Sequence, residues 1–370
     1  MVIYMLDYLR KLYDYLPSLS LPEDALREVS SAVSKCIADD KLMDAVEKYY
    51  KDFFASEKEY GREISEITDS YADSKLGAGM VFAVVMFLRA FILTSKKAYI
   101  YNGEAINFFA PVVRQYGINL KRNGVFGLVS VQRFWTYCYL RPTSFELGRL
   151  AFEIIDYNYG YEVWQNPKTG KSYPVALPDE RFDENGLPDS EGSFCTTLSY
   201  DGETLTGYTY KNDGTLDFEI KTFKGYKCVL KGGDKVVAVH MPGNAKLSEE
   251  AVSASLIGAK EFFDTYFKNL NYRAFVSSSW LLDTGLRKIL KEDSNIVKLQ
   301  KRFRIALAFK NDFSLFDNIF EVPKCPIEEL IPQNRFQKEV LEMIKGGRSL
   351  YSGRGYILKH QLSITADDEF

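Results

Sequence analysis

Four short stretches of the chain each join a strongly patterned segment to polar side chains at its end. They are the sequences GRLAFE (148–153), HMP (240–242), SSWLLD (278–283) and SNIVKLQKRF (294–303). The ends of strands and helices are where α/β proteins hold their ligands. The pattern therefore predicts a small-molecule site, although it does not name a substrate.

Two residues in these stretches can act as a general base. Glu153 lies in the apolar sequence LAFEII, on the same strand face as Ala151 and Ile155. A carboxylate held away from water on such a face is a more useful base; the alternative is a solvated face or an ion pair with Arg149. His240 ends a strand, and a neutral imidazole can take a proton from an amine nucleophile. A hydrogen-bonded core histidine is the alternative.

Ser279 is a third candidate catalytic residue. It follows a strand expected at 272–277 and can bind a substrate carbonyl or a phosphate. A triad of Ser279, His240 and Asp283 is conceivable, but no Gly-x-Ser-x-Gly sequence accompanies it. Asp283 is more simply explained as the cap of a short helix at 286–290.

The segment 241–248, which joins a strand to a helix, is a candidate phosphate site. A helix N-terminus attracts phosphate through unpaired N–H groups and a partial positive charge. Gly243 would allow close backbone approach, and Lys246 adds charge. The candidate cofactor-binding residues are Met241, Gly243, Asn244, Lys246 and Ser248. The alternative is an ordinary strand-to-helix turn in which Ser248 is the N-cap.

Residues 287–304 contain seven basic side chains and only two acidic ones. On the helix expected at 295–303, the apolar positions should face the core while Lys298, Lys301 and Arg302 face outward. Such a patch attracts an anionic cosubstrate. The alternative is a solvated helix face.

The composition argues against several classes of protein. The chain has 370 residues, a length typical of two domains, and a net charge of −3, which argues against a nucleic-acid-binding protein. Two histidines exclude a His-rich metal site, and five scattered cysteines indicate reduced core thiols in a cytoplasmic protein. The first residues predict a helix and not a signal peptide. The longest apolar run, at 76–88, is too short to span a bilayer.

Helical periodicity dominates residues 1 to about 145. The sequence SLPE at 20–23 predicts a capping box, and helices are expected near 43–54, 77–93, 103–116 and 126–139.

From 147 the apolar period becomes two, and Asp-Gly, Asn-Asp-Gly and Gly-Gly turns predict an antiparallel meander that ends at 235–241. Residues 165–193, rich in Pro, Gly, Asp and Asn, predict a loop or a small excursion. A helix after Ser248 and a strand at 272–277 complete a crossover, so the fold class is α+β with a mixed sheet.

These residues resemble a bacterial family of two-domain acyltransferase-like proteins. In that family a helical N-terminal domain precedes a C-terminal domain similar to the GNAT N-acyltransferases. The matching pieces are 148–153, 239–242, 279–283, 294–303 and a helix with Gln333, Gln337, Val340 and Leu341. The Arg/Gln-x-x-Gly-x-Gly/Ala phosphate loop of GNAT enzymes is missing here, and its place would be 241–248.

The pattern and the resemblance together predict a helical domain at 1–145 and a GNAT-like domain, with a mixed, mostly antiparallel sheet and flanking helices, at 146–370. The resemblance implies direct attack of a small-molecule amine on acetyl-CoA or another acyl-CoA, with no metal. Nucleic acid and membrane are not expected as partners, and the oligomeric state is not determined. The rival interpretation is a non-catalytic ligand-sensing or assembly protein that retains the fold, which the missing phosphate loop favours.

Overall fold

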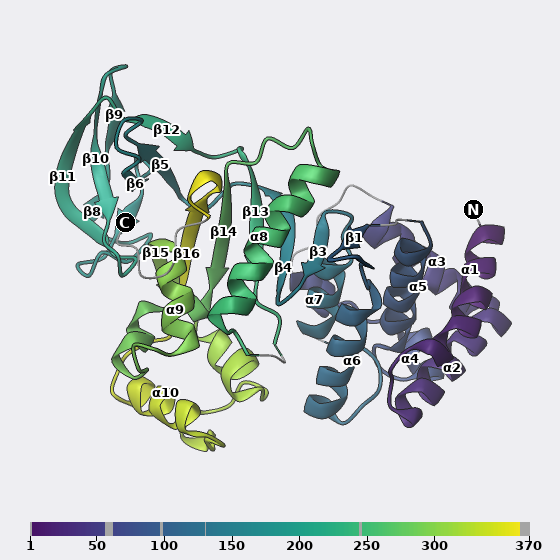
Figure 1. Ribbon diagram of the computed structural model, residues 1–370. Coiled ribbons are helices and arrows are strands. Elements are labelled where there is room, and N and C mark those ends of the chain that lie inside the picture. Colours follow the sequence, from purple (N-terminus) through teal and green to yellow (C-terminus); the bar gives the residue numbers. More distant parts are fainter. Residues whose placement is uncertain (1, 56–61, 97–98, 130, 244–245, 363–370) are drawn as a thin grey trace. The chain divides into compact units, whose positions relative to one another are not determined.

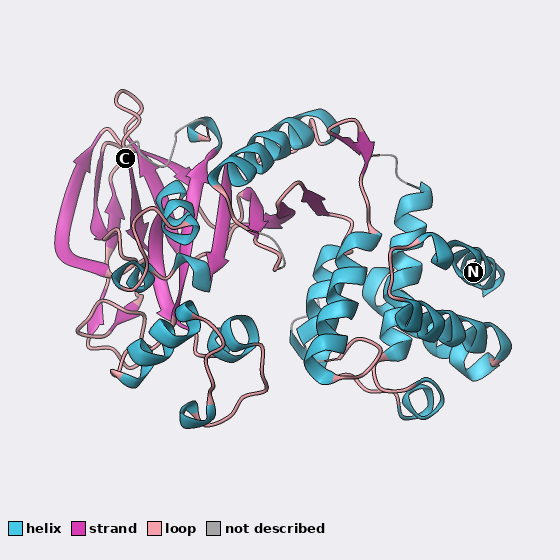
Figure 2. Ribbon diagram, turned by 60° about the horizontal axis from the view of Figure 1, so that its bottom comes forward, coloured by secondary structure: helices cyan, strands magenta, loops and turns pink. Residues whose placement is uncertain are grey.

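The computed structural model describes residues 2–55, 62–96, 99–129, 131–243 and 246–362. The chain divides into two compact units, Met1–Glu146 and Leu147–Phe370. Figure 2 shows that helices build the first unit apart from a small hairpin, whereas most of the strands belong to the second.

The first unit packs its helices around α5 (Met80–Lys96), most of whose side chains are buried. A helix that is apolar on all sides is buried on all sides, and this confirms the central position expected for it. Around it lie α1 (Val2–Tyr15), α2 (Glu23–Ala38), α3 (Asp40–Phe54), α4 (Ser70–Leu76), α6 (Phe109–Asn123) and α7 (Val131–Tyr139). No single described helix is long and apolar enough to cross a membrane; α4 and α5, bent by 87° between them, pass that test only as a pair.

Two local expectations for the first unit are wrong. The SLPE capping box is not formed, because α2 begins only at Glu23 and no side chain caps it. The helix expected from 103 begins at Phe109, after a hairpin of β1 (Ile100–Tyr101) and β2 (Glu104–Ala105). Its turn residues Asn102 and Gly103 have φ of 51° and 82°, the positive values that an Asn-Gly hairpin turn requires.

The main sheet of the second unit has the strand order β15-β16-β14-β13-β4-β3 (Figure 1). Its strands are β3 (Ser144–Leu147), β4 (Leu150–Asp156), β13 (Lys235–His240), β14 (Ala274–Ser279), β15 (Arg304–Lys310) and β16 (Tyr351–Leu358). Strands β13 and β14 are parallel and are joined through α8 (Glu249–Tyr266). This confirms the expected strand-helix-strand crossover. Phe152 of β4 meets Phe263 of α8 with ring centroids 6.4 Å apart, so α8 covers this face of the sheet.

A second sheet, with the order β11-β10-β6-β5-β12, corrects the predicted meander and the predicted loop at 165–193. Its strands are β5 (Tyr161–Gln165), β6 (Ser172–Ala176), β9 (Leu198–Tyr200), β10 (Thr204–Tyr210), β11 (Leu216–Lys224) and β12 (Lys227–Leu230), with β9 paired to β10. The β10–β11 hairpin is confirmed, but β12 pairs with β5 and β13 joins the main sheet. Strands β7 (Arg181–Phe182) and β8 (Phe194–Cys195) form a separate two-stranded antiparallel sheet.

Aromatic side chains fill the core between these two sheets, on the face of the main sheet opposite α8. Tyr161 is central to it, with ring centroids 5.7 Å from Tyr157, 6.0 Å from Tyr210 and 6.1 Å from Tyr356. The five cysteines are all free, but Cys195 is exposed, so the expectation of core thiols is wrong for that residue.

Short helices fill most of the chain between β14 and β16. They are η3 (Trp280–Leu282), η4 (Thr284–Lys288), α9 (Asn295–Arg302), the π-helix η5 (Leu315–Phe320), η6 (Ile327–Glu329) and α10 (Arg335–Lys345). Their starts follow the sequence signals: Asp283 caps η4, and Ser294 caps α9. They share a core that includes Leu286, Phe316 and Leu350.

Candidate functional site

The parallel strands β13 and β14 separate before they end. The ladder between them has two residue pairs, Val237 with Phe275 and Ala238 with Val276. Beyond these pairs β13 stays with β4 as far as His240, and β14 stays with β16 as far as Ser279. Each strand therefore follows its outer neighbour, and the two central strands part at their carboxyl ends.

Glu153 and His240 form a hydrogen-bonded pair at this opening. The Nε2 atom of His240 lies 3.2 Å from Oε2 of Glu153. The Glu153 side chain is 7% exposed and that of His240 27%, so the carboxylate is buried, as expected, and the imidazole reaches solvent. Glu153 lies opposite Ala238 in the antiparallel ladder, which puts it on the same face of the sheet as His240. A carboxylate on one ring nitrogen fixes the orientation and tautomer of the imidazole.

Ser279 does not join this pair. Side chains alternate along β14, so Ser277 and Ser279 share one face, and Ser278 shares the other with His240. The Ser279 Oγ accepts a hydrogen bond of 3.2 Å from the N–H of Leu281 and caps η3. The structure thus brings Glu153 and His240 together and places Ser279 on the other face.

Asp283 binds Arg348 and not His240, which excludes the triad. Its two oxygens accept hydrogen bonds of 2.6 and 2.9 Å from the Arg348 guanidinium. They also accept from the N–H groups of Gly285 and Tyr351, at 2.9 and 3.0 Å. The carboxylate is buried and its lone pairs are committed to holding η4 against β16.

The described residues of the loop, 241–243 and 246–248, show ordinary turn and cap chemistry. Ser248 is the N-cap of α8, accepting 3.3 Å from the N–H of Ala251. A side chain at Gly243 would meet open space, so no close approach requires glycine there. The Met241 sulfur lies 3.9 Å from the Ser277 hydroxyl. Asn244 lies outside the described residues.

Several cations surround the start of α8. Lys246 is exposed, and its carbonyl accepts 3.1 Å from Nε of Arg149. A shallow depression between α8 and α9 is lined by Leu247, Glu249, Val252, Asn295, Lys298, Leu299 and Arg302. Within it, Nζ of Lys298 lies 3.1 Å from Glu249.

Arg302 corrects the outward-facing pattern expected for α9. It is 6% exposed and donates 3.3 Å from Nη2 to the carbonyl of Leu362. Burial lowers the pKa of its guanidinium, and Glu249 opposes that shift. Lys301 does face outward and pairs with Glu292 at 3.1 Å. The helical period alone could not identify an arginine whose partner is a backbone carbonyl distant in the sequence.

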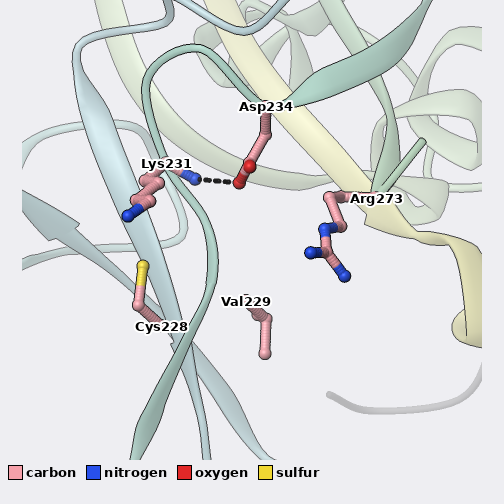
Figure 3. Close-up of a pocket in the computed structure, with 5 residues that line it drawn as sticks. All are labelled: Cys228, Val229, Lys231, Asp234 and Arg273. Carbon is pink, nitrogen blue, oxygen red and sulfur yellow. Dashed lines mark hydrogen bonds between the residues drawn. The ribbon is translucent and has the colours of Figure 1, made fainter. Parts of the chain in front are cut away.

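A cavity of about 340 Å³ lies at the opposite end of β13 (Figure 3). Cys228 and Val229 come from β12, Lys231 and Asp234 from the following turn, and Arg273 from the residue before β14. The Lys231 N–H donates 2.9 Å to Asp234. Burial, with Glu162 nearby, raises the pKa of Cys228 to about 12, so its thiol is not a nucleophile.

Sequence reasoning missed Arg354 of β16, which shares the sheet face of His240. It lies between Gly353 and Gly355, where a Cβ atom would come within 2.5 Å of the Leu282 carbonyl and 3.0 Å of Phe303. Glycines in a strand mark close approach. An arginine between two of them in a buried strand was the signal that could have found it.

The chain is similar to known proteins in sequence and in fold. A family model described as GNAT-like C-terminal domain matches residues 145–357. Among curated proteins, none matches the chain. A crystal structure of an acyltransferase mutant in complex with octanoyl-CoA has a TM-score of 0.61 at 18% identity, covering 94% of this chain and 88% of that one. An acyltransferase in complex with decanoyl-CoA and teicoplanin has a TM-score of 0.59 at 18% identity, covering 93% and 86%. The expected α+β fold, helical at first and then GNAT-like with a mixed, mostly antiparallel sheet, is confirmed.

Proposed function

Because this chain belongs to the GNAT-like C-terminal domain family, we propose that it is an N-acyltransferase that uses acetyl-CoA or another acyl-CoA and acts on a small-molecule amine. In this proposal residues 146–370 form the acyltransferase domain, preceded by the helical domain at 1–145. The observation that carries the proposal is the parting of β13 and β14 beside a hydrogen-bonded Glu153–His240 pair. Similar structures that hold octanoyl-CoA and decanoyl-CoA support it.

The parted strands supply what a thioester arm needs. Beyond Ala238 and Val276 no backbone hydrogen bond joins the described residues of β13 and β14, and the Ser277 hydroxyl bonds across to the Val239 carbonyl. Past that bond an extended arm can enter between the strands and bond to their backbone, as an added strand would. Backbone N–H groups near 240–243 then polarise the thioester carbonyl, which develops negative charge in the transition state.

His240 is the proposed base and Glu153 its positioning partner. With Nε2–H donated to Glu153, the basic lone pair of the ring is on Nδ1. The amine nitrogen forms a bond to the thioester carbon, and the carbon–sulfur bond breaks. The amine loses its proton to His240, and the leaving thiolate regains one, so the products are an amide and free CoA thiol.

The phosphates of CoA are proposed to bind beside the start of α8. Lys246, Arg149 and Lys298 lie around that helix end, whose N–H groups attract anions. Glu249 and Glu250 in the first turn oppose this, so the cations must outweigh two carboxylates. Lys298, already held by Glu249, would exchange that partner for a phosphate.

Calorimetric titration with CoA, octanoyl-CoA and decanoyl-CoA tests the cosubstrate. Binding is expected, and Lys298→Ala should weaken it about fivefold to tenfold, the scale of one charge-assisted contact. Lys301→Ala is the matched control, because Lys301 lies on the same helix and pairs with Glu292 outside the depression. The proposal fails if the wild-type protein binds none of the three.

Release of CoA thiol in the presence of amines tests the chemistry. His240→Gln should lower the rate by about 10²–10⁴, the usual contribution of a general base. Glu153→Gln should lower it less, because the imidazole remains. His360→Gln is the control: the only other histidine lies on the surface, 3.1 Å from Gln165. Equal rates in all variants would remove His240 from the mechanism.

The second candidate function is a non-catalytic ligand sensor or assembly module that retains the fold. The two carboxylates at the start of α8 favour it, because they stand where a pyrophosphate would lie. This candidate predicts neither acyl-CoA binding nor thiol release for any amine.

A further inference from the structure

Arg354 and His240 occupy one row across the main sheet. Arg354 lies opposite Ser278, and Ser278 is two residues beyond Val276, the partner of Ala238. His240 is likewise two residues beyond Ala238, so His240, Ser278 and Arg354 point to the same face. One interstrand spacing, about 5 Å at the backbone, separates Ser278 from Arg354. His240 lies farther from Ser278 than one such spacing, because β13 and β14 have parted there.

The middle residue of this row, Ser278, has a small and exposed side chain. Tyr159, from the connection after β4, lies over the same face, where the Arg354 guanidinium is 5.6 Å from its ring centroid. Burial raises the pKa of Tyr159; Arg354 opposes this shift and Glu153 adds to it. Arg354 and Glu153 therefore both lie close enough to influence the same tyrosine.

The guanidinium of Arg354 is held flat and left without a counter-ion in the described residues. It lies between the rings of Tyr159 and Phe309, 5.6 and 5.0 Å from their centroids. Its Nη1 donates 3.0 Å to the carbonyl of Tyr159, which neutralises no charge. Its Nε is buried without a hydrogen-bond partner, and no described carboxylate forms an ion pair with it.

Such an arginine is costly unless something binds it. The two rings and the carbonyl offset part of the hydration that the cation loses on burial, but they do not neutralise its charge. Nε is closed to solvent, so a ligand can reach only the terminal nitrogens, and no described residue uses Nη2. Nη2 can donate a charge-assisted hydrogen bond to a carboxylate.

From this we infer that the acceptor carries a carboxylate besides its amine, and that Arg354 is the residue that recognises it. The inference depends on the proposed acyl transfer only for the position of the amine, because the position of the carboxylate is argued from Arg354 alone. The amine lies at His240, the connecting carbons pass over Ser278, and the carboxylate meets Arg354. The substrate class is therefore amino acids or other amino carboxylates.

Binding of product mimics tests this without requiring turnover. The probes are the N-octanoyl derivatives of glycine, β-alanine and γ-aminobutyrate, each as the free acid and as the primary amide, titrated into the full chain by calorimetry. At least one acid should bind about tenfold or more tightly than its amide, the scale of a charge-assisted pair. The chain length that binds most tightly indicates the distance between the amine position and the carboxylate position.

Variants assign the preference to Arg354. Arg354→Gln should remove the preference for the acid, and Arg354→Lys, which keeps the charge but not the planar group held between two rings, should retain only part of it. Should the glutamine variant not fold, the lysine variant supplies the comparison. Arg304→Gln is the matched control. Arg304 on β15 also has a buried Nε without a partner, but it lies opposite Tyr356 and not in the row of His240, Ser278 and Arg354.

The inference is overturned if every acid and amide pair binds equally, if none of the probes binds, or if Arg354→Gln keeps the preference. The proposed function fails separately. If amines without a carboxylate are acylated as fast as amino acids, acyl transfer is supported and carboxylate recognition by Arg354 is contradicted. If the acid preference persists but no amine is acylated, carboxylate recognition is supported and the proposed enzymatic function is contradicted.

Discussion

The Ser277 hydroxyl donates a 2.9 Å hydrogen bond to the carbonyl of Val239, from β14 across to β13, at the first position beyond their backbone ladder. A side chain thus replaces the missing ladder bond. It satisfies a carbonyl that the parting of the strands would otherwise leave buried and unpaired. The opening between the strands is in this way stabilised where it begins.

Ser277→Ala should therefore destabilise the protein by about 1–3 kcal/mol, the cost of leaving a buried carbonyl without a partner. Ser278→Ala is the matched control, because the next residue is exposed and should change stability by less than about 0.5 kcal/mol. Urea unfolding of the two variants measures both. Equal midpoints would show that water satisfies Val239 instead.

Asp283→Asn should cost about 3 kcal/mol or more. The substitution leaves the Arg348 guanidinium without its carboxylate in a largely buried setting. Asp312→Asn removes an exposed partner of Lys310 and should have almost no effect. Denaturant unfolding gives the difference. If the folded Asp283→Asn protein also lost acyl transfer while its stability stayed unchanged, Asp283 would have a catalytic role after all.

The cysteines should differ sharply in alkylation. Burial raises the pKa of Cys36 to about 12, with Asp39 adding to the shift, and the pKa of Cys228 to about 12. At pH 8 both thiols stay protonated and do not attack iodoacetamide, whereas exposed Cys195 is accessible. Mass spectrometry after brief labelling should find Cys195 modified first, and the other two only in urea. Early labelling of Cys228 would contradict its raised pKa.

Asp39 should make the stability of the helical unit depend on pH. The Tyr71 hydroxyl donates 2.7 Å to it, and this bond lowers the pKa of Asp39; the N–H groups of Leu42 and Lys41 lower it further, against a smaller effect of burial. Because the folded pKa lies below the unfolded value of about 3.9, the stabilisation is present above that value. It is lost as the pH falls through the folded pKa.

Asp39→Ala should accordingly lower the Tm at pH 7, where the cap of α3 is charged. The difference from wild type should shrink as the pH falls below the unfolded value. Asp44→Ala, on the exposed side of the same helix, is the control. A Tm difference that does not change with pH would show that the cap acts without its charge.

Local signals predicted elements well, because each is decided within a few residues. Ser248, Ser294 and Asp283 cap the helices expected to follow them. The all-apolar sequence of α5 placed it in a core. A strand carrying Glu153 among apolar neighbours predicted a buried carboxylate, and the structure buries it.

Strand partners were not predictable in the same way. A hairpin pattern favours pairing with the next strand, yet β12 pairs with β5 and β13 with β4. Register and partner depend on which apolar faces meet in the core, and that is a property of the whole chain. The same holds for β6, whose short apolar stretch lies in a segment rich in turn residues.

The sequence by itself determined most of the elements, the caps at Ser248, Asp283 and Ser294, and the separate candidates Glu153 and His240. Only the tertiary structure decided that these two meet at 3.2 Å, that Ser279 faces the other way and that Arg302 is buried. It alone set Arg354 in the row of His240, through the β13–β14 and β14–β16 registers. Periodicity and capping are encoded in short windows, whereas a site built across several strands exists only after distant segments have paired.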